Sequence, residues 1–190
     1  MKVPAGQKTR PTQARVRQAW LNSIQFFVPD AKVLDLFSGS GALGFEALSR
    51  GAESVIFVES QREAIQCLKI NAAELGVESQ IQIFQQDVWS WLKTPPSFSF
   101  DLIFADPPYS KGYEERLLLQ CPWRQLLAPS GRFCLEWSPQ KGAQTELPQS
   151  AGGLVKLREK SYGETVLSTY AFPEAQEGGP EMPKSEEENA

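Results

Sequence analysis

One short stretch of the sequence, AKVLDLFSGSGALG at residues 31–44, constrains the fold more than any other. Its residues 32–36 predict a short buried strand, and residues 42–50 predict the helix that follows. Between them the spacing Gly39-x-Gly41-x-x-Gly44 indicates a tight turn, in which a side chain would keep the backbone away from a ligand. Because the same spacing also occurs by chance in glycine-containing turns, it indicates a nucleotide-binding element without proving one.

A second apolar run, Val55 to Val58 in SVIFVES, is followed by an acidic residue, Glu59. Glu59 follows Gly41 by 18 positions. An acid about that far along, at the tip of the second strand, is placed to accept hydrogen bonds from the ribose hydroxyls of an adenosine. The glycine turn and Glu59 together predict a cofactor that contains a nucleoside.

The residues just before the glycines decide between two kinds of cofactor. In a dinucleotide site the first strand leads directly into the first glycine, and the pyrophosphate rests on the N-terminus of the helix. Here Asp35-Leu36-Phe37-Ser38 intervenes, and the Asp35 carboxylate at the strand tip would repel a pyrophosphate. The sulfonium and amino groups of S-adenosylmethionine are cationic, so this stretch favours a methyl donor over a dinucleotide.

Length and composition indicate one soluble domain. The chain has 190 residues, 41% of them hydrophobic, and no apolar run near the ~18 residues that a membrane span needs. The segment MKVPAGQKTR lacks the apolar part of a secretory signal, and the three cysteines have no disulfide or metal-site spacing. We therefore expect a cytoplasmic location and no membrane partner. The lack of histidine excludes imidazole catalysis and histidine-bound metals.

Charge divides the chain into three parts. The first 20 residues carry five lysines and arginines and no acid, whereas residues 173–190 carry six glutamates and one lysine. We predict a basic N-terminal arm at residues 1–12, a folded domain at residues 13–172 and an acidic disordered tail at residues 173–190. Because the tail is so acidic, the net charge of −4 does not argue against an anionic partner.

The first predicted helix runs from Gln13 to about Phe27, with Thr12 as its N-cap and an apolar face at positions 16, 20, 24 and 27. Arg15 and Arg17 lie in its first turns. They fit either a solvated basic face or a clamp over a cofactor carboxylate or a phosphate backbone, and the sequence leaves both alternatives open.

A third predicted strand, at residues 80–84, is followed by Asp87. Asp87 fits an acceptor for the exocyclic amine of adenine, and it equally fits a plain surface turn. Trp89 and Trp91 follow on a short helical segment. We expect them to serve core packing and the wall of a pocket rather than base stacking.

A nearly unbroken apolar strand, FDLIFA at residues 100–105, leads directly into Asp106-Pro107-Pro108-Tyr109. The two prolines force a rigid, extended exit from the strand. A nucleobase amine is a poor nucleophile because its lone pair is delocalised into the ring. A carboxylate and a loop carbonyl that accept its N–H groups would orient it toward a methyl sulfonium, and Tyr109 would stack on the extruded base. These four residues are the predicted catalytic site.

The order of the predicted elements indicates the fold class. The strands above alternate with helices, residues 131–137 predict a fifth strand, and residues 155–160 and 165–172 predict an antiparallel hairpin. We predict an α/β fold with a doubly wound, mostly parallel seven-stranded sheet that ends in this hairpin. Four acids then fall at the C-terminal tips of consecutive strands, where such sheets bind ligands: Asp35, Glu59, Asp87 and Asp106.

Several segments together resemble the RsmD family of small-subunit ribosomal RNA guanine-N2 methyltransferases: RPTQARVRQAWLNSI, VLDLFSGSGALGFEALSRGA, the Glu59 strand and FDLIFADPPY. The glycine turn is common to class I methyltransferases and DPPY to many amino-methylating ones, whereas RPT-x-x-RVR and KSYGET are more specific to this family. The resemblance covers about residues 9–172 and implies a Rossmann-like class I fold. It also implies S-adenosylmethionine as cofactor, and ribosomal RNA or the small ribosomal subunit as partner.

The same resemblance implies roles for individual residues. It places Asp35 and residues 37–41 around the methionine moiety, Glu59 on the ribose and Asp87 near adenine, with Asp106 to Tyr109 on the target guanine. The full predicted cofactor-binding set is Arg10, Thr12, Asp35, Phe37, Ser38, Gly39, Gly41, Glu59, Ser60, Asp87 and Val88.

Two other classes of function stay open at this point. One is an amino-methyltransferase that acts on adenine N6 in DNA or on a protein glutamine, although such enzymes more often carry asparagine where this chain has Asp106. The other is a non-enzymatic RNA-binding or assembly factor with the same fold, against which the intact acids and glycines argue. We expect a monomer without a metal ion.

Overall fold

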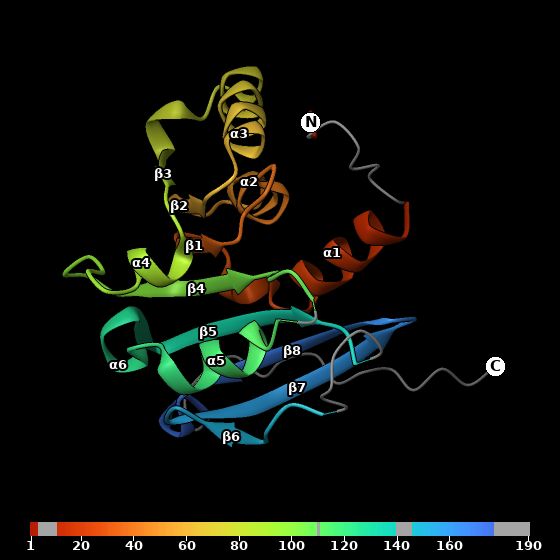
Figure 1. The fold of residues 1–190 in the computed structure, drawn as a ribbon, viewed down its shortest axis with the longest axis vertical. Helices are drawn as coiled ribbons and strands as arrows, with labels where there is room; N and C mark the ends of the chain where they lie inside the picture. The colour runs from red at the N-terminus through yellow and green to blue at the C-terminus, as the bar shows by residue number, and fades with distance from the viewer. Residues whose placement is uncertain (4–10, 110, 140–145, 177–190) are drawn as a thin grey trace.

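A sheet of eight strands forms the centre of the protein, in the order β3-β2-β1-β4-β5-β8-β7-β6 (Figure 1). The computed structural model describes residues 1–3, 11–109, 111–139 and 146–176. Arg10, most of the predicted basic arm and nearly all of the predicted acidic tail lie outside these ranges. The α/β class, the mostly parallel sheet and the C-terminal antiparallel hairpin are confirmed.

The sheet has a parallel part and an antiparallel part. The parallel strands are β1 (Lys32–Leu36), β2 (Ser54–Glu59), β3 (Ile81–Gln85), β4 (Phe100–Ala105) and β5 (Leu127–Trp137). The antiparallel strands are β6 (Ser150–Ala151), β7 (Leu154–Tyr162) and β8 (Thr165–Ala171). Strand β1 pairs with β2 on one side and with β4 on the other, so the strand order reverses there. A ligand site is expected at the carboxyl ends of the strands around this reversal.

Helices cover both faces of the sheet. One face carries α1 (Pro11–Ser23), α2 (Ala42–Ser49) and α3 (Arg62–Leu75), and the other carries α4 (Val88–Trp91), α5 (Tyr113–Gln120) and α6 (Trp123–Leu126). Short 3₁₀ turns occur at η1 (Gln25–Phe27), η2 (Glu78–Gln80) and η3 (Pro173–Gln176). Alternate residues of β1 feed the two cores, since Val33 packs with α1 to α3 and Leu34 with α4 to α6. This two-sided burial explains why the parallel strands are almost continuously apolar.

The structure corrects three details of the predicted fold. The first four residues of the predicted disordered tail form the turn η3, in which Ala175 is 8% exposed against the core. The sheet has an eighth strand, β6, because residues 150–151 pair with β7; a strand of two residues has no periodic pattern that a sequence could display. The first helix begins at Pro11, so Thr12 lies inside α1 rather than capping it, and α1 ends at Ser23 before the separate turn η1. Proline suits the first helical position because its missing N–H would have no partner there.

Candidate active site

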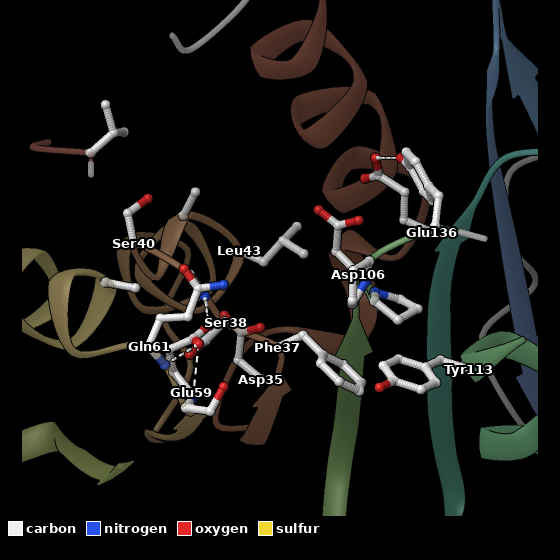
Figure 2. Close-up of a pocket in the computed structure, with 18 of the residues that line it drawn as sticks. Asp35, Phe37, Ser38, Ser40, Leu43, Glu59, Gln61, Asp106, Tyr113 and Glu136 are labelled. Atoms are coloured by element: carbon white, nitrogen blue, oxygen red, sulfur yellow. Dashed lines mark hydrogen bonds between the residues drawn. The ribbon is translucent and has the colours of Figure 1, made fainter. Parts of the chain in front are cut away.

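A cavity of about 460 Å³ opens at the carboxyl ends of β1, β2 and β4. Figure 2 shows Glu59 on one side of this cavity, Asp106 and Glu136 on the other, and Asp35 between them. The sequence-predicted residues that line it are Asp35, Phe37, Ser38, Gly39, Glu59, Ser60, Asp106, Pro107, Pro108 and Tyr109. The structure therefore brings the predicted cofactor loop and the predicted catalytic loop to one space.

The glycines of the loop after β1 serve two different purposes. Gly39 has a φ of +54°, and a Cβ built on it would meet no atom within 4 Å. Its missing side chain therefore leaves space at the cavity wall. Gly41 has a φ of +82°, and a Cβ there would lie 2.5 Å from Cδ2 of Leu68. Gly41 does not line the cavity, so its conformation and its contact with α3 explain the glycine.

Asp35 is a buried acid at the bottom of the cavity, with 2% of its surface exposed. Burial raises its pKa, the hydrogen bond from the Gly44 N–H opposes this, and the negative charge of Glu59 adds to it, so that the pKa rises from 3.8 to about 7. Among the described residues no cation contributes to this pKa, so the charge of the Asp35 carboxylate is not balanced by the protein there. Asp35 is therefore suited to hold the positive charge of a ligand.

Glu59 is held by the backbone around it. Its Oε2 accepts a hydrogen bond of 2.9 Å from the N–H of Gly39, and its Oε1 accepts bonds of 2.8 Å from the N–H groups of Ser60 and Gln61. The carboxylate thus ties the loop after β1 to the loop after β2. This arrangement fixes the carboxylate at the cavity edge before a ligand arrives, which lowers the ordering cost of binding.

Besides Gly41, two other predicted cofactor residues do not line the cavity. The Asp87 carboxylate accepts a hydrogen bond of 3.0 Å from the Ser90 N–H and so caps α4, and the Val88 side chain is buried in the core at 3% exposure. Neither residue lines the cavity, and their contact with a cofactor stays a prediction.

Aromatic rings form one wall beside this space. Phe37, at the unusual φ of +57° for a non-glycine residue, stacks on Tyr113 with ring centroids 5.7 Å apart and planes 20° apart. The edge of Trp89 packs against both rings, and the Arg116 guanidinium lies 3.8 Å from the Trp89 centroid. Trp89 packs behind Phe37 and Tyr113 and does not itself line the cavity, so its expected role in a pocket wall stays a prediction. Trp91 is 4% exposed within the core, as expected.

The predicted catalytic loop, residues 106–109, occupies the opposite end of the cavity. Asp106 is solvent-accessible there, while Pro107 directly after it is buried. The hydroxyl of Tyr109 donates a hydrogen bond of 3.0 Å to Oε1 of Glu136 on β5 and accepts one from Thr165 at the start of β8. The Tyr109 ring is thereby held by two other strands, and its predicted stacking on a base stays a prediction.

Negative charge accumulates at this end. The pKa of Asp106 is raised by the protein atoms that crowd its carboxylate and by the charges of Glu136 and Asp35, against which Arg17 acts. Burial also raises the pKa of Glu136, which the Tyr109 hydrogen bond and Arg17 counteract. Arg17 lines the cavity, and the alternative that it clamps a cofactor carboxylate or a phosphate backbone stays a prediction.

The N-terminal residues reach over the cavity from outside. The side chain of Asn71 on α3 is fully buried; its Oδ1 accepts from the Lys2 N–H at 2.6 Å, and its Nδ2 donates to the Lys2 carbonyl at 2.9 Å and to the Ser40 carbonyl at 3.1 Å. Val3 consequently lines the cavity. One buried amide thus joins the chain start to the glycine loop.

A family model matches most of the chain. The model described as "Conserved hypothetical protein 95" matches residues 1–171. The chain belongs to this family. The RsmD resemblance is confirmed with it, because curated relatives named "Ribosomal RNA small subunit methyltransferase D" also match the chain.

Two curated relatives match most of this chain. "Putative rRNA methyltransferase YlbH" of Bacillus subtilis is 36% identical over 172 residues, which are 90% of this chain and 91% of the relative. "Ribosomal RNA small subunit methyltransferase D" of Escherichia coli strain K12 is 31% identical over 168 residues, which are 88% of this chain and 82% of the relative. Among solved structures, "Putative methyltransferase yhhF from Escherichia coli" superimposes with a TM-score of 0.76 at 30% identity, covering 90% of this chain and 91% of that one.

Two features of this family member were absent from the predicted site. Glu136 is an acid that interrupts the apolar run FCLEW at residues 133–137, and that break in the pattern was the available signal. The contact between Asn71 and Lys2 had no signal in the sequence, because an asparagine inside a predicted helix does not indicate a hydrogen-bond partner 69 positions away. Among the described residues no group of histidine, cysteine, aspartate or glutamate side chains could hold a metal ion, and no helix is long and apolar enough to cross a membrane.

Proposed function

We propose that this protein transfers a methyl group from S-adenosylmethionine to the exocyclic N2 amine of a guanine in small-subunit ribosomal RNA. The observation that carries the proposal is the shared cavity, in which Glu59 lies at one end, Asp106 lies at the other and Asp35 lies between them. A cofactor and a nucleobase bound at the two ends would meet inside it. Family membership and the names of the relatives support the RNA substrate.

The cofactor end fits a cationic nucleoside. Asp35 is a buried carboxylate whose pKa no cation lowers in the part of the chain that the structure describes, so it suits the amino and sulfonium charges of S-adenosylmethionine. The open space at Gly39 leaves room for a ligand against the backbone, and Glu59 suits the ribose hydroxyls. When bound, S-adenosylmethionine supplies an electrophilic methyl group on sulfur.

The residues at the other end would act on the amine. Asp106 and a carbonyl of the proline loop accept the two N–H groups, which directs the nitrogen lone pair toward the methyl carbon. A new N–C bond forms as the S–C bond breaks, sulfur keeps the bonding electrons, and the amine loses a proton. The raised pKa of Asp106 makes its carboxylate a stronger base for that proton. This route needs neither a histidine nor a metal.

The proposal is tested by methylation of small-subunit ribosomal RNA, free and in particles, from a strain without this activity. Nucleoside mass spectrometry of the wild-type reaction is expected to find N2-methylguanosine. Asp106→Asn is expected to lower turnover by ~100-fold or more while calorimetry finds nearly unchanged cofactor affinity, because Asp106 acts on the amine.

The control for this experiment is Glu53→Gln, which removes an exposed carboxylate next to the amino end of β2, away from the cavity. It should keep wild-type turnover. N6-methyladenosine or a methylated protein glutamine as the only product would contradict the proposal. Full activity of Asp106→Asn would remove Asp106 from the mechanism.

A further inference from the structure

Glu136 is a second carboxylate at the end of the cavity where Asp106 lies, on a different strand. It is 7% exposed, comes from the interior of the sheet on β5, and lines the cavity. Acids are seldom this buried unless a partner compensates them. Among the described residues the Tyr109 hydroxyl is its one hydrogen-bond donor, at 3.0 Å. A buried carboxylate that accepts a single hydrogen bond from the described part of the chain is suited to accept another from a ligand.

The neighbours of Glu136 fix where its carboxylate points. Tyr109 follows Asp106 in the rigid proline loop, and its hydroxyl both donates to Glu136 and accepts from Thr165 on β8. The loop that carries Asp106 is therefore bonded to the strand that carries Glu136. Figure 2 shows the two carboxylates at the same end of the cavity. Arg17 lines the same cavity and supplies the positive charge that favours the ionised form of both.

The purine bases differ in what they offer to such a pair of acceptors. The Watson–Crick edge of guanine carries the N1–H donor directly beside the N2 amine. Adenine instead carries an N6 amine beside N1, which is an acceptor. An ionised carboxylate can only accept hydrogen bonds, so it attracts N1–H of guanine and repels the N1 lone pair of adenine. A base drawn out of its stack is read on this edge.

We propose that Glu136 is the residue that selects guanine, its carboxylate accepting the hydrogen bond of N1–H while Asp106 accepts that of the adjacent N2 amine. Tyr109 then acts as a positioning residue for Glu136. The inference rests on the proposed function, because it assigns a reading group to the base that is methylated. It makes guanine specificity a property of β5, apart from the proline loop that orients the amine.

The test compares two versions of a short RNA that contains the methylated position, once wild-type enzyme has located it. One version has guanine there, and the other has 2-aminopurine, which keeps the 2-amino group but has a lone pair at N1. Wild-type enzyme should prefer guanine by ~100-fold or more in kcat/KM, because the analogue leaves the buried Glu136 unpaired. Glu136→Gln, whose amide can donate to that lone pair, should reduce the preference to ~10-fold or less.

Two further variants provide an independent test and a control for this comparison. Tyr109→Phe keeps the ring and removes the hydroxyl that orients Glu136, so it should lower the preference for guanine without changing cofactor affinity. It also tests the inference if Glu136→Gln does not fold. Glu53→Gln is the matched control and should retain the wild-type preference.

The outcomes separate the two proposals. If wild-type enzyme forms N2-methylguanosine and both Glu136→Gln and Tyr109→Phe keep the wild-type preference, the inference is overturned and the proposed function stands. If wild-type enzyme forms no N2-methylguanosine, the proposed function itself fails. A collapse of the preference in Glu136→Gln at unchanged cofactor affinity supports the role of Glu136.

Discussion

The backbone N–H of Gly44, in the first turn of α2, donates a hydrogen bond of 3.0 Å to Oδ2 of Asp35 near the end of β1. This bond is the largest opposing influence on a pKa that burial raises to about 7. Asp35 is therefore a proton-binding group in the pH range where the protein would act, and its protonation is linked to both folding and ligand binding.

The first prediction concerns pH and folding. Because the pKa of Asp35 in the folded state lies above its unfolded value of 3.8, the folded state binds the proton more tightly. The stability that this group contributes is fully present below about pH 4 and is lost as the pH rises toward about 7. Chemical denaturation of Asp35→Asn between these limits should show a smaller fall than the wild type. An identical fall in both proteins would remove Asp35 as its cause.

Ligand binding to Asp35 should show the opposite sign. A cationic ligand favours the carboxylate, so the affinity for S-adenosylmethionine should rise with pH by up to about tenfold per unit below the pKa and level off above it. Calorimetry in buffers of different ionisation enthalpy should detect proton release near pH 7. Asp35→Asn should bind more weakly and release no proton, and undiminished release would assign it to another group.

Glu59→Gln should weaken S-adenosylmethionine binding by about 1–3 kcal/mol. The carboxylate accepts three backbone hydrogen bonds, from Gly39, Ser60 and Gln61, and an amide cannot accept all of them through both of its ends. Glu63→Gln is the matched control, since Glu63 is exposed in the first turn of α3. Calorimetric affinities that are equal for the two variants would show that Glu59 does not bind the cofactor.

The glycines of the loop should separate into packing and ligand positions. A Cβ on Gly44 would lie 2.7 Å from Cζ of Phe57 and 2.8 Å from Cγ1 of Val55, so Gly44→Ala should destabilise the fold by about 1–3 kcal/mol or more. Gly39→Ala meets no neighbour within 4 Å and should cost about 1–2 kcal/mol for its left-handed backbone. Relative to its loss of folding stability, Gly39→Ala should nevertheless lose more cofactor affinity than Gly44→Ala. Thermal unfolding and calorimetry together check this, and the reverse order would contradict it.

Asn71→Ala should loosen the chain start and weaken the cofactor site together. The substitution removes the buried amide that holds the Lys2 backbone and the Ser40 carbonyl, at a cost of about 1–3 kcal/mol in the free energy of unfolding. Hydrogen exchange of the first residues should accelerate. Glu74→Ala is the control, because it removes only the exposed ion pair with Lys2 and should change stability by less than about 1 kcal/mol. Equal effects of both variants would refute a special role of Asn71.

Local sequence signals were sufficient to predict the strands of this protein and the loops that follow β1 and β4. Apolar runs predicted the strands because parallel strands between two helix layers are buried on both faces. The glycine spacing and the proline pair marked the loops after β1 and β4, because both residue types restrict the backbone at their own position. Since parallel strands share one direction, the sequence sufficed to assign Asp35, Glu59 and Asp106 to one edge of the sheet.

The tertiary structure alone decided which contacts the side chains at that edge make. It turned Asp87 toward the start of α4, added the buried Glu136 beside Asp106, and joined Lys2 to Asn71 across 69 positions. These relationships depend on which side chains meet after the sheet has twisted and the helices have packed. A sequence pattern reports the state of a residue along its own element, whereas a hydrogen bond between distant elements depends on their position and orientation relative to each other.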